Sequence, residues 1–597
     1  MHRLGALTRW ATFLALGLLM LYTPLAILLV PGVLLLWLGR QDEPASLLVI
    51  VAASSISFWM AAFWYLEQFN TSYTQAFHAV AIFTLVGLGL LFAIRQEQKL
   101  FAAPSATDCL VLAVVIVLAL LRFRAMWLVE VPAGADMSMH SYIAALIQNA
   151  QGIPESYYPL LPLEEFSVFP VGFHSLVALV ASIQGLEIHR AGLIVSCFSY
   201  GLMLLACYAL LRRVSGPVVA GMVAITFNYL TDDPASFAQW GGNPTVLASA
   251  LFVVLVLLLM GIPQQRLRAA LPAGAILAGI MATHTIVLVQ AFYLLLLSLP
   301  FYFYWSSDWR RSLSPALVLG AIACVCMLPY LLSIDVHVVT PQVTDWIRGW
   351  VRESPHSWQG DITNFLWTIP HYAADRLGWK YLLLTGIFCV PIGLAWTQST
   401  KRPAVIFAGM LLVAGMLLIL NSQYWVLPLS YLIYPERVML LLIVPLSMLL
   451  AMGLESALSR ISKPRQATAV GLVLLITVVV PAVRNNEKDF VAKQAEYSSV
   501  TANDKKAIAW IAHNTPADAV IDNNYGDAGL WIPAIAGRAV TNAHVNVVYL
   551  DKLQTQSAPT YRFVGEKCVY PDCPPGSEGR LLIAFGEARV YQLDSGQ

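Results

Sequence analysis

The chain has 597 residues, of which 58% are hydrophobic and only 12% are charged, and its formal net charge is +1. This charged fraction is about half of that in soluble domains, so the composition excludes an ordinary soluble protein and indicates a polytopic membrane protein. The near-neutral charge balance leaves no basic face for phosphates, which argues against a nucleic-acid partner.

The N-terminal segment "MHRLGALTRW" joins basic residues to an apolar run, as a signal sequence does. No small-residue cleavage site follows, and the apolar stretch continues beyond Pro24, so we predict a retained membrane anchor. Its two segments, 10–23 and 25–39, are short and form either two spans or a re-entrant hairpin.

Apolar runs recur as far as residue 483, and each is long enough to cross a bilayer core of about 30 Å. Lys and Arg accumulate on the cytoplasmic side, so placing the basic clusters there sets the orientation. Arg122 and Arg124 fit this arrangement poorly, because they lie near the outer end of their span. We predict about 13 to 15 transmembrane helices, drawn from 10–23, 25–39, 46–65, 75–94, 105–128, 191–211, 216–230, 243–262, 270–286, 287–305, 314–334, 379–398, 403–420, 434–453 and 467–483.

The orientation places the long polar segments on the outer side of the membrane. These are the loops 129–170, 229–242, 335–378 and 421–433, and the tail from residue 484. Segment 170–185 is too short to span a bilayer and is predicted to be an interfacial helix. We therefore expect a membrane domain over 1–484 and a soluble extracytoplasmic domain over 485–597, with any chemistry outside the membrane.

The first external loop holds the first candidates for chemistry, because a carboxylate kept at a membrane surface is costly and usually functional. Asp136 and His140 share one face if "DMSMHSYIAALIQNA" is helical, and Gly134 permits close backbone approach. Asp136 alternatively caps this helix, and His140 is alternatively an ordinary interfacial histidine. Glu130 is a rival acid, but it abuts the preceding span.

Two further acidic pairs occupy external loops. Glu164 and Glu165 suit the rim of an acceptor groove, whereas Asp232 and Asp233 in "TDDPASFAQWGGN" also fit a common turn. Adjacent carboxylates point to different faces, so a tight divalent-cation site is not expected. We predict no cofactor beyond a weak divalent-cation site, in which either Asp232 or Asp233 would join Asp136.

The tail differs in composition, because charged residues and Asn become frequent and the apolar runs shorten. It contains a helical pattern over 500–514 that begins with the cap-like "TAND", and three short strand patterns, "AVIDNN", "RLLIAF" and "ARVYQL". These predict a small α/β domain of about 100 residues. Cys568 and Cys573 lie close together in an oxidising compartment, which favours a disulfide over a metal pair.

Several short motifs occur at the outer ends of the predicted helices. They are "YYPLLPLEEFSVFPVGFHSLVAL", which contains Tyr158 and His174, "MATHT" around His284, "YPERVMLLL" around Arg437, and "DAGLWIPAIAGRAVTNAHVN" in the tail. Together with an acidic residue in the first external loop, they resemble the GT-C superfamily of polyprenol-dependent membrane glycosyltransferases. The likeness is to an uncharacterised bacterial branch and covers nearly the whole chain.

The resemblance implies a GT-C-like helical membrane domain that transfers a sugar from a polyprenyl phosphate or diphosphate to an external glycan, lipid or protein. It implies a bacterial inner-membrane protein whose site faces the periplasm. Asp136 would deprotonate the acceptor, and Arg437 would stabilise the leaving phosphate. Arg437 alternatively pairs with Glu436 or anchors at the interface. The further candidates are His140 in catalysis, Arg348 and Lys380 for the phosphate, and Tyr158, His174, Asp232, Trp240 and His284 for substrates.

Three alternatives stay open from the sequence. Trp240 either stacks on a sugar or belongs to an aromatic belt at the membrane boundary. An O-antigen polymerase or ligase would also use a lipid-linked sugar, although it would rely on Arg and His and would not need so large a tail. A transporter or flippase would show internal repeats and charges near the bilayer midplane, which the sequence pattern does not favour.

Overall fold

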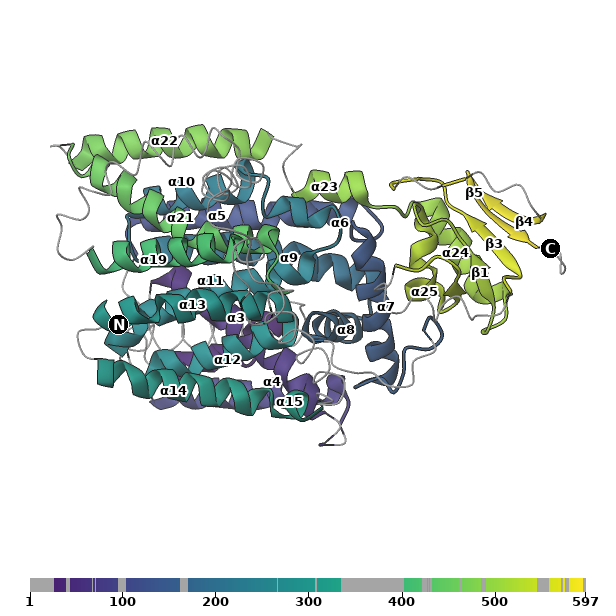
Figure 1. The fold of residues 1–597 in the computed structure, drawn as a ribbon, viewed down its shortest axis with the longest axis horizontal. Coiled ribbons are helices and arrows are strands. Elements are labelled where there is room, and N and C mark those ends of the chain that lie inside the picture. The colour runs from purple at the N-terminus through teal and green to yellow at the C-terminus, as the bar shows by residue number, and fades with distance from the viewer. Residues whose placement is uncertain are drawn as a thin grey trace, which may run out of the picture.

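The computed structural model describes a helical body followed by a smaller α/β unit (Figure 1). The described residues are 26–38, 43–66, 68–69, 71–94, 104–161, 170–265, 267–305, 309–333, 402–420, 427, 429, 432–461, 464–484, 490–544, 558–570, 573–574 and 579–593. The predicted spans 10–23 and 379–398, the whole of loop 335–378, and the candidates Glu164, Glu165, Arg348 and Lys380 lie outside them.

The helical body contains long apolar helices joined by shorter ones. Its α-helices are α2 (Ala26–Leu29), α3 (Pro44–Ala62), α4 (Tyr73–Ile94), α5 (Ala106–Leu121), α6 (Ala125–Leu128), α7 (Ala135–Ala150), α8 (Gly172–Gln184), α9 (Ile188–Leu211), α10 (Pro217–Ile225), α11 (Asn243–Gln265), α12 (Leu267–Thr283), α13 (Thr285–Trp305), α14 (Trp309–Cys326), α15 (Leu328–Ser333), α19 (Arg402–Ile419), α21 (Pro435–Leu458) and α22 (Pro464–Arg484). The 3-10 helices are η1 (Gly32–Leu38), η2 (Phe63–Tyr65), η3 (Arg122–Arg124) and η5 (Ala235–Ala238), and η4 (Thr226–Leu230) is a π-helix.

Within the described part of the chain, seven helical stretches are long and apolar enough to cross a membrane. They are Pro44–Tyr65, Tyr73–Leu90, Ala106–Leu128, Ile188–Leu211, Asn243–Gly261, Arg402–Ile419 and Pro435–Leu458. Helices α9, α11 and α21 form the inside of the body, since 83%, 83% and 89% of their apolar stretches are buried, against 28% for α4. This confirms the predicted polytopic α-helical membrane protein, while the total of 13 to 15 spans stays a prediction.

Arg122, the awkward residue of the predicted topology, is fully buried by protein. Its guanidinium donates to the carbonyl oxygen of Asn228 at 2.7 Å and lies 3.8 Å from the ring centroid of Tyr229. A charge in this setting is held by a carbonyl dipole and an aromatic face, so it does not have to contact lipid. The position of Arg122 directly after the C-terminal end of α5 is therefore compatible with a membrane span.

The C-terminal unit contains α23 (Phe490–Tyr497), α24 (Ala502–Asn514), β1 (Val520–Asp522), η7 (Ala528–Trp531), α25 (Ile532–Ala536), β2 (Ala539–Val540), β3 (Tyr561–Val564), β4 (Arg580–Phe585) and β5 (Ala588–Gln592). The sheet has the strand order β2-β1-β3-β5-β4. Strands β2, β1 and β3 are parallel, and β3, β5 and β4 are antiparallel. The predicted helix begins at a capping box of Thr501 and Asp504, and the predicted disulfide joins Cys568 to Cys573.

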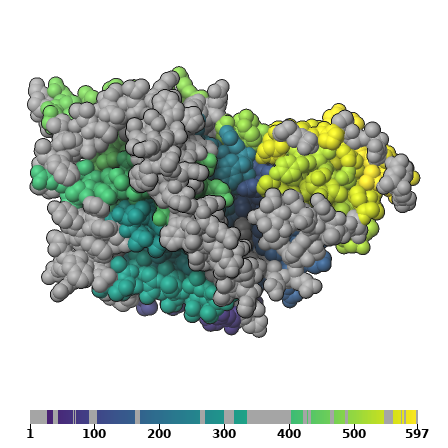
Figure 2. Space-filling model, in the orientation of Figure 1, coloured from purple at the N-terminus to yellow at the C-terminus, as the bar shows by residue number. Residues whose placement is uncertain are grey.

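The C-terminal unit protrudes from one end of the helical body (Figure 2). Helix α7 crosses this end of the bundle and lies between the body and the sheet (Figure 1). The amide of Ala133, just before α7, donates to Gln494 Oε1 at 2.8 Å, and the Ser498 hydroxyl donates to the carbonyl oxygen of Val131 at 3.0 Å. The tail therefore contacts the segment that leads into α7.

Candidate active site

Asp136 lies in the first turn of α7, where two loops cross closely. Gly134 precedes the helix with φ 95°, and a Cβ there would lie 2.0 Å from the Gly241 nitrogen. The crossing is fixed because the Asp136 amide donates to the carbonyl oxygen of Trp240 at 3.0 Å. The N-cap is Gly134, without a side-chain cap bond, so the carboxylate of Asp136 is not the capping group of this helix.

The carboxylate of Asp136 instead meets a histidine of the C-terminal unit. Asp136 Oδ1 lies 2.5 Å from Nε2 of His544, and Nδ1 of His544 lies 2.5 Å from the Tyr525 hydroxyl oxygen. The side chains of Asp136 and His544 are 31% and 28% exposed, so both remain accessible from solvent. The sequence analysis did not identify His544 or Tyr525.

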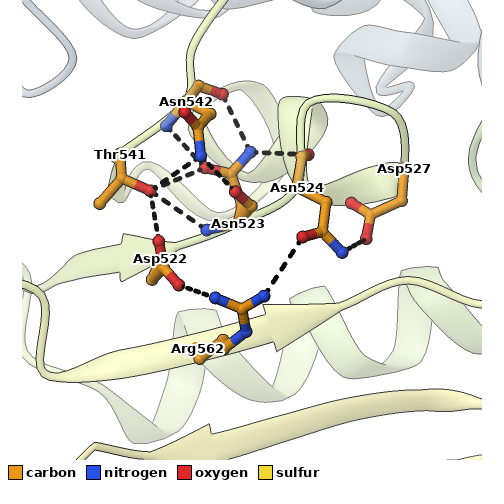
Figure 3. A network of polar contacts seen from close by, with 7 residues as sticks. All are labelled: Asp522, Asn523, Asn524, Asp527, Thr541, Asn542 and Arg562. Atoms are coloured by element: carbon orange, nitrogen blue, oxygen red, sulfur yellow. Dashed lines mark hydrogen bonds and ion pairs between the residues drawn. The ribbon is translucent and has the colours of Figure 1, made fainter. Parts of the chain in front are cut away.

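Two parallel strands explain how Tyr525 and His544 come together. Tyr525 follows β1 and His544 follows β2, and the carboxyl ends of parallel strands meet at one edge of a sheet. Figure 3 shows hydrogen bonds that join the two loops at this edge. The Asn542 amide donates to Asn523 Oδ1 at 2.9 Å, and Asn523 Nδ2 donates to the Asn542 carbonyl oxygen at 2.9 Å.

An ion pair supports the same edge from the third strand. Arg562 on β3 pairs with Asp522, and it also donates to Asn524 Oδ1 at 3.3 Å. Asn524 in turn donates to Asp527 Oδ2 at 3.1 Å, which completes the chain of contacts in Figure 3. Asp527 is buried, and burial raises its pKa despite the amides of Gly529 and Gly565 that donate to it. The network fixes the backbone on both sides of Tyr525.

Three further histidines lie on the body side of the site. His140, four residues after Asp136 on α7, places Nδ1 2.8 Å from Nε2 of His174 on α8. His284, between α12 and α13, places Nε2 3.1 Å from the Thr245 hydroxyl oxygen. A Cβ on Gly172 would lie 2.6 Å from the Ala282 carbonyl oxygen, so the ends of α8 and α12 meet closely.

The charge state of His140 follows from its surroundings. Burial lowers its pKa from 6.5 to about 4, and the positive charge of Arg437 acts in the same direction. The Asp136 carboxylate opposes this shift without overcoming it. The His140 imidazole is therefore neutral at neutral pH. It shares one hydrogen bond with the His174 imidazole, and the contact requires no positive charge on His140.

Arg437 lies in the first turn of α21, on the same side of the molecule as the histidines. Its guanidinium carbon is 4.9 Å from the ring centroid of Tyr434 and 5.5 Å from that of Trp240. Its Nη1 is buried and has no hydrogen-bond partner among the described residues, and no ion pair with Glu436 occurs within that part of the chain. The Asp136 carboxylate lies within electrostatic range of this guanidinium.

The structure thus brings together most of the site residues expected from the sequence: Asp136, His140, His174, Trp240, His284 and Arg437. Tyr158 lies elsewhere. Its side chain is 55% exposed and lines a groove of about 510 Å³ between the second half of α7 and α25.

In the acidic pair of loop 229–242, the Asp233 side chain has a structural role in its turn, while the Asp232 carboxylate stays a predicted substrate contact. Asp233 is buried and accepts a hydrogen bond from the Ser236 hydroxyl, while the Asp232 carbonyl oxygen accepts from the Ser236 amide at 2.8 Å. In the described ranges, no group of three or more His, Cys, Asp or Glu side chains is arranged to hold a metal ion.

Comparisons with known proteins bear on the whole chain. A family model described as "Family of unknown function (DUF6541)" matches residues 25–556. No curated protein matches by sequence. Among solved structures, the arabinofuranosyltransferase AftD from Mycobacteria is 12% identical, with a TM-score of 0.53, and the match covers 83% of this chain and 40% of that one.

Two other solved structures match with lower TM-scores. ArnT from Cupriavidus metallidurans is 14% identical, with a TM-score of 0.49 and coverage of 82% of this chain and 98% of that one. The Archaeoglobus fulgidus oligosaccharyltransferase is 12% identical, with a TM-score of 0.45 and coverage of 76% and 69%. The likeness to AftD shows that the chain has the GT-C fold, as the sequence motifs predicted.

Proposed function

This chain belongs to the family of unknown function DUF6541, and from that premise and its site geometry we propose that it is a membrane glycosyltransferase. It would move a sugar from a polyprenyl phosphate or diphosphate to a hydroxyl of an extracytoplasmic glycan, lipid or protein. The observation that carries the proposal is that an accessible carboxylate, Asp136, lies within electrostatic range of the Arg437 guanidinium, whose Nη1 is buried, at the end of a GT-C helical body.

The transfer step assigns one role to each of these two groups. The acceptor oxygen attacks the anomeric carbon, and its proton passes to the carboxylate of Asp136. The bond between the anomeric carbon and the phosphate oxygen breaks, and the electron pair leaves on the polyprenyl phosphate. The developing negative charge is stabilised by the Arg437 guanidinium, which is already in place and does not have to reorganise.

The surroundings of Arg437 support its phosphate role. A buried N–H without an acceptor costs about 1–3 kcal/mol, and more when the group is charged, so a protein rarely keeps one without use. The aromatic faces of Tyr434 and Trp240 hold the guanidinium without occupying its hydrogen-bond donors. A lipid phosphate would supply the acceptor that Nη1 lacks among the described residues.

The remaining candidates would bind the substrates. Neutral His140 and His174 can donate to or accept from sugar hydroxyls, and Trp240 offers an aromatic face. Arg348 and Lys380 stay proposed phosphate contacts. We also propose that the site faces the periplasm of a bacterial inner membrane. A weak divalent cation at Asp136 is a further proposal, and it is tested by adding EDTA and then restoring divalent cations.

Membranes that contain the full chain test the proposed function directly. They are given radiolabelled hexoses and pentoses carried on polyprenyl phosphate, and incorporation of label into endogenous acceptors is compared with membranes that lack the protein. We expect incorporation from at least one donor, with release of an equal amount of polyprenyl phosphate. Equal incorporation in the two membranes for every donor would contradict the proposal.

A further inference from the structure

We propose that the C-terminal unit supplies a positioning pair to the active site, in which His544 orients the Asp136 carboxylate and Tyr525 fixes the tautomer of His544. The inference rests on the proposed function, because it gives Asp136 the role of base. It adds that the membrane domain alone does not hold a competent base, since the groups that orient Asp136 come from the tail.

The hydrogen-bonding capacity of the three side chains determines the direction of each bond. An ionised carboxylate can only accept, so His544 Nε2 donates to Asp136 Oδ1. In the neutral imidazole the other nitrogen then accepts, so the Tyr525 hydroxyl donates to Nδ1. Burial raises the pKa of Tyr525, and the nearby Asp136 charge acts in the same direction, which keeps the phenol protonated as a donor.

This arrangement leaves one carboxylate oxygen for the reaction. Oδ1 of Asp136 is engaged by His544, so the acceptor proton would pass to Oδ2 while the phosphate leaves from the anomeric carbon. His544 keeps its own proton throughout and acts only through Asp136. Its bond holds the carboxylate in one rotamer, so that Oδ2 has a fixed position for the reaction.

Hydrogen bonds hold the tail against the two loops that carry the site. The Gly134 amide donates to the carbonyl oxygen of Tyr497 at 3.4 Å, beside Asp136. On the opposite side, the Tyr570 hydroxyl donates to the Gln239 carbonyl oxygen at 3.1 Å, next to Trp240. The parallel-strand edge of Figure 3 fixes the loops of Tyr525 and His544 within the tail. His544 therefore meets Asp136 through contacts on both sides.

Several ionisable groups lie within electrostatic range of this pair. From α7 this is His140, from α21 Arg437, and from the tail Tyr525 and Tyr570. Loss of the His544 donor removes the hydrogen bond that holds Oδ1 of Asp136 in place. Turnover should then fall, because the base is no longer held in a fixed orientation.

The test compares His544→Leu, which removes the donor, with His544→Gln, which keeps an amide donor. Transfer is measured in membranes that hold the full chain. We expect His544→Leu to lower turnover by about 10- to 100-fold, the scale of one lost hydrogen bond to a charged group. His544→Gln should keep most of the turnover, and Tyr525→Phe should lose less than His544→Leu.

His513→Leu is the matched control, because His513 is an exposed histidine of the same unit whose Nδ1 contacts its own helix at the carbonyl oxygen of Ala509. It should leave turnover unchanged. Wild-type turnover in His544→Leu overturns the proposal, and so does an equal loss in His544→Leu and His544→Gln. Asp136→Asn is measured in parallel: if it retains transfer, Asp136 is not the base, whereas the absence of transfer in wild-type membranes would contradict the proposed function itself.

Discussion

The Asp136 carboxylate and the His544 imidazole lie 2.5 Å apart, although 408 positions separate them in the chain. Asp136 begins a helix at the end of the membrane body, and His544 follows a strand of the C-terminal unit. The candidate active site is therefore formed between two units, and each of them can be tested by substitution.

Replacing Arg437 with Ala should weaken binding of the lipid-linked donor. The guanidinium is desolvated and its Nη1 has no acceptor among the described residues, so a bound phosphate would make a buried, charge-assisted contact worth about 2–5 kcal/mol. The change should raise the donor KM strongly and leave the acceptor KM much less affected. Arg589→Ala is the control, since this arginine is 45% exposed in the tail and pairs with Glu587. Unchanged donor affinity in Arg437→Ala would leave Arg437 as a structural residue.

Gly134→Ala should unfold the junction between the two external loops. A Cβ at this position would meet the Gly241 nitrogen at 2.0 Å, and φ 95° is itself unfavourable for alanine. Gly185→Ala is a matched control, because Gly185 also has positive φ, 60°, but nothing lies within 4 Å of the added Cβ. We expect Gly185→Ala to cost about 1 kcal/mol from backbone strain and Gly134→Ala several times more. Thermal unfolding in detergent compares them, and equal losses would contradict the close crossing.

The neutral state of His140 predicts a pH dependence of stability. Its folded pKa of about 4 lies below the ordinary 6.5, so the unfolded chain binds more protons between these values and stability falls as pH is lowered from about 6.5 to about 4. His140→Gln should make this fall in melting temperature shallower. The exposed His513 provides the control, because His513→Gln should keep the wild-type slope. A wild-type slope in His140→Gln would contradict the burial of His140.

The disulfide provides a test of topology. The Cys568–Cys573 loop packs on the backbone beside Tyr525, since a Cβ on Gly526 would lie 2.5 Å from Cys573 Sγ. If the tail faces the exterior, a membrane-impermeant thiol reagent applied to intact cells should label these cysteines only after reduction. Labelling without reductant would contradict the disulfide, and labelling only after the membrane is opened would contradict the outward orientation.

The sequence was sufficient for those parts of the fold that follow from local patterns. Apolar runs predicted the long helices, and the Thr501–Asp504 cap predicted the start of α24. Asp136 stood out because a carboxylate followed a glycine at the start of an amphipathic pattern. Strands β2 and β3 were missed, since they have only two and four residues and offer little alternation to recognise.

The partner of Asp136 could not be predicted from local patterns. His544 and Tyr525 are brought to Asp136 by strand order and by docking of the tail, which depend on contacts between distant segments. One signal was present in the sequence: "DNNY" and "TNAH" are similar Asn-containing segments with an aromatic or His residue at the end. Had both been recognised as loops after parallel strands, they would have predicted one shared edge of a sheet.

Asp136→Asn is the most direct test of the central claim, because it keeps the shape of the side chain and an acceptor for His544 while removing the charge and basicity. Transfer of labelled sugar from a polyprenyl-phosphate donor is measured in membranes, with Glu130→Gln as the control. Glu130 lies in the same loop and is also partly exposed, and its Oε2 is 3.7 Å from Nζ of Lys505. A catalytic base predicts a loss in turnover of about 100-fold or more in Asp136→Asn and near-normal transfer in Glu130→Gln, with expression intact in both. Near-normal transfer in Asp136→Asn would contradict the assignment of the active site.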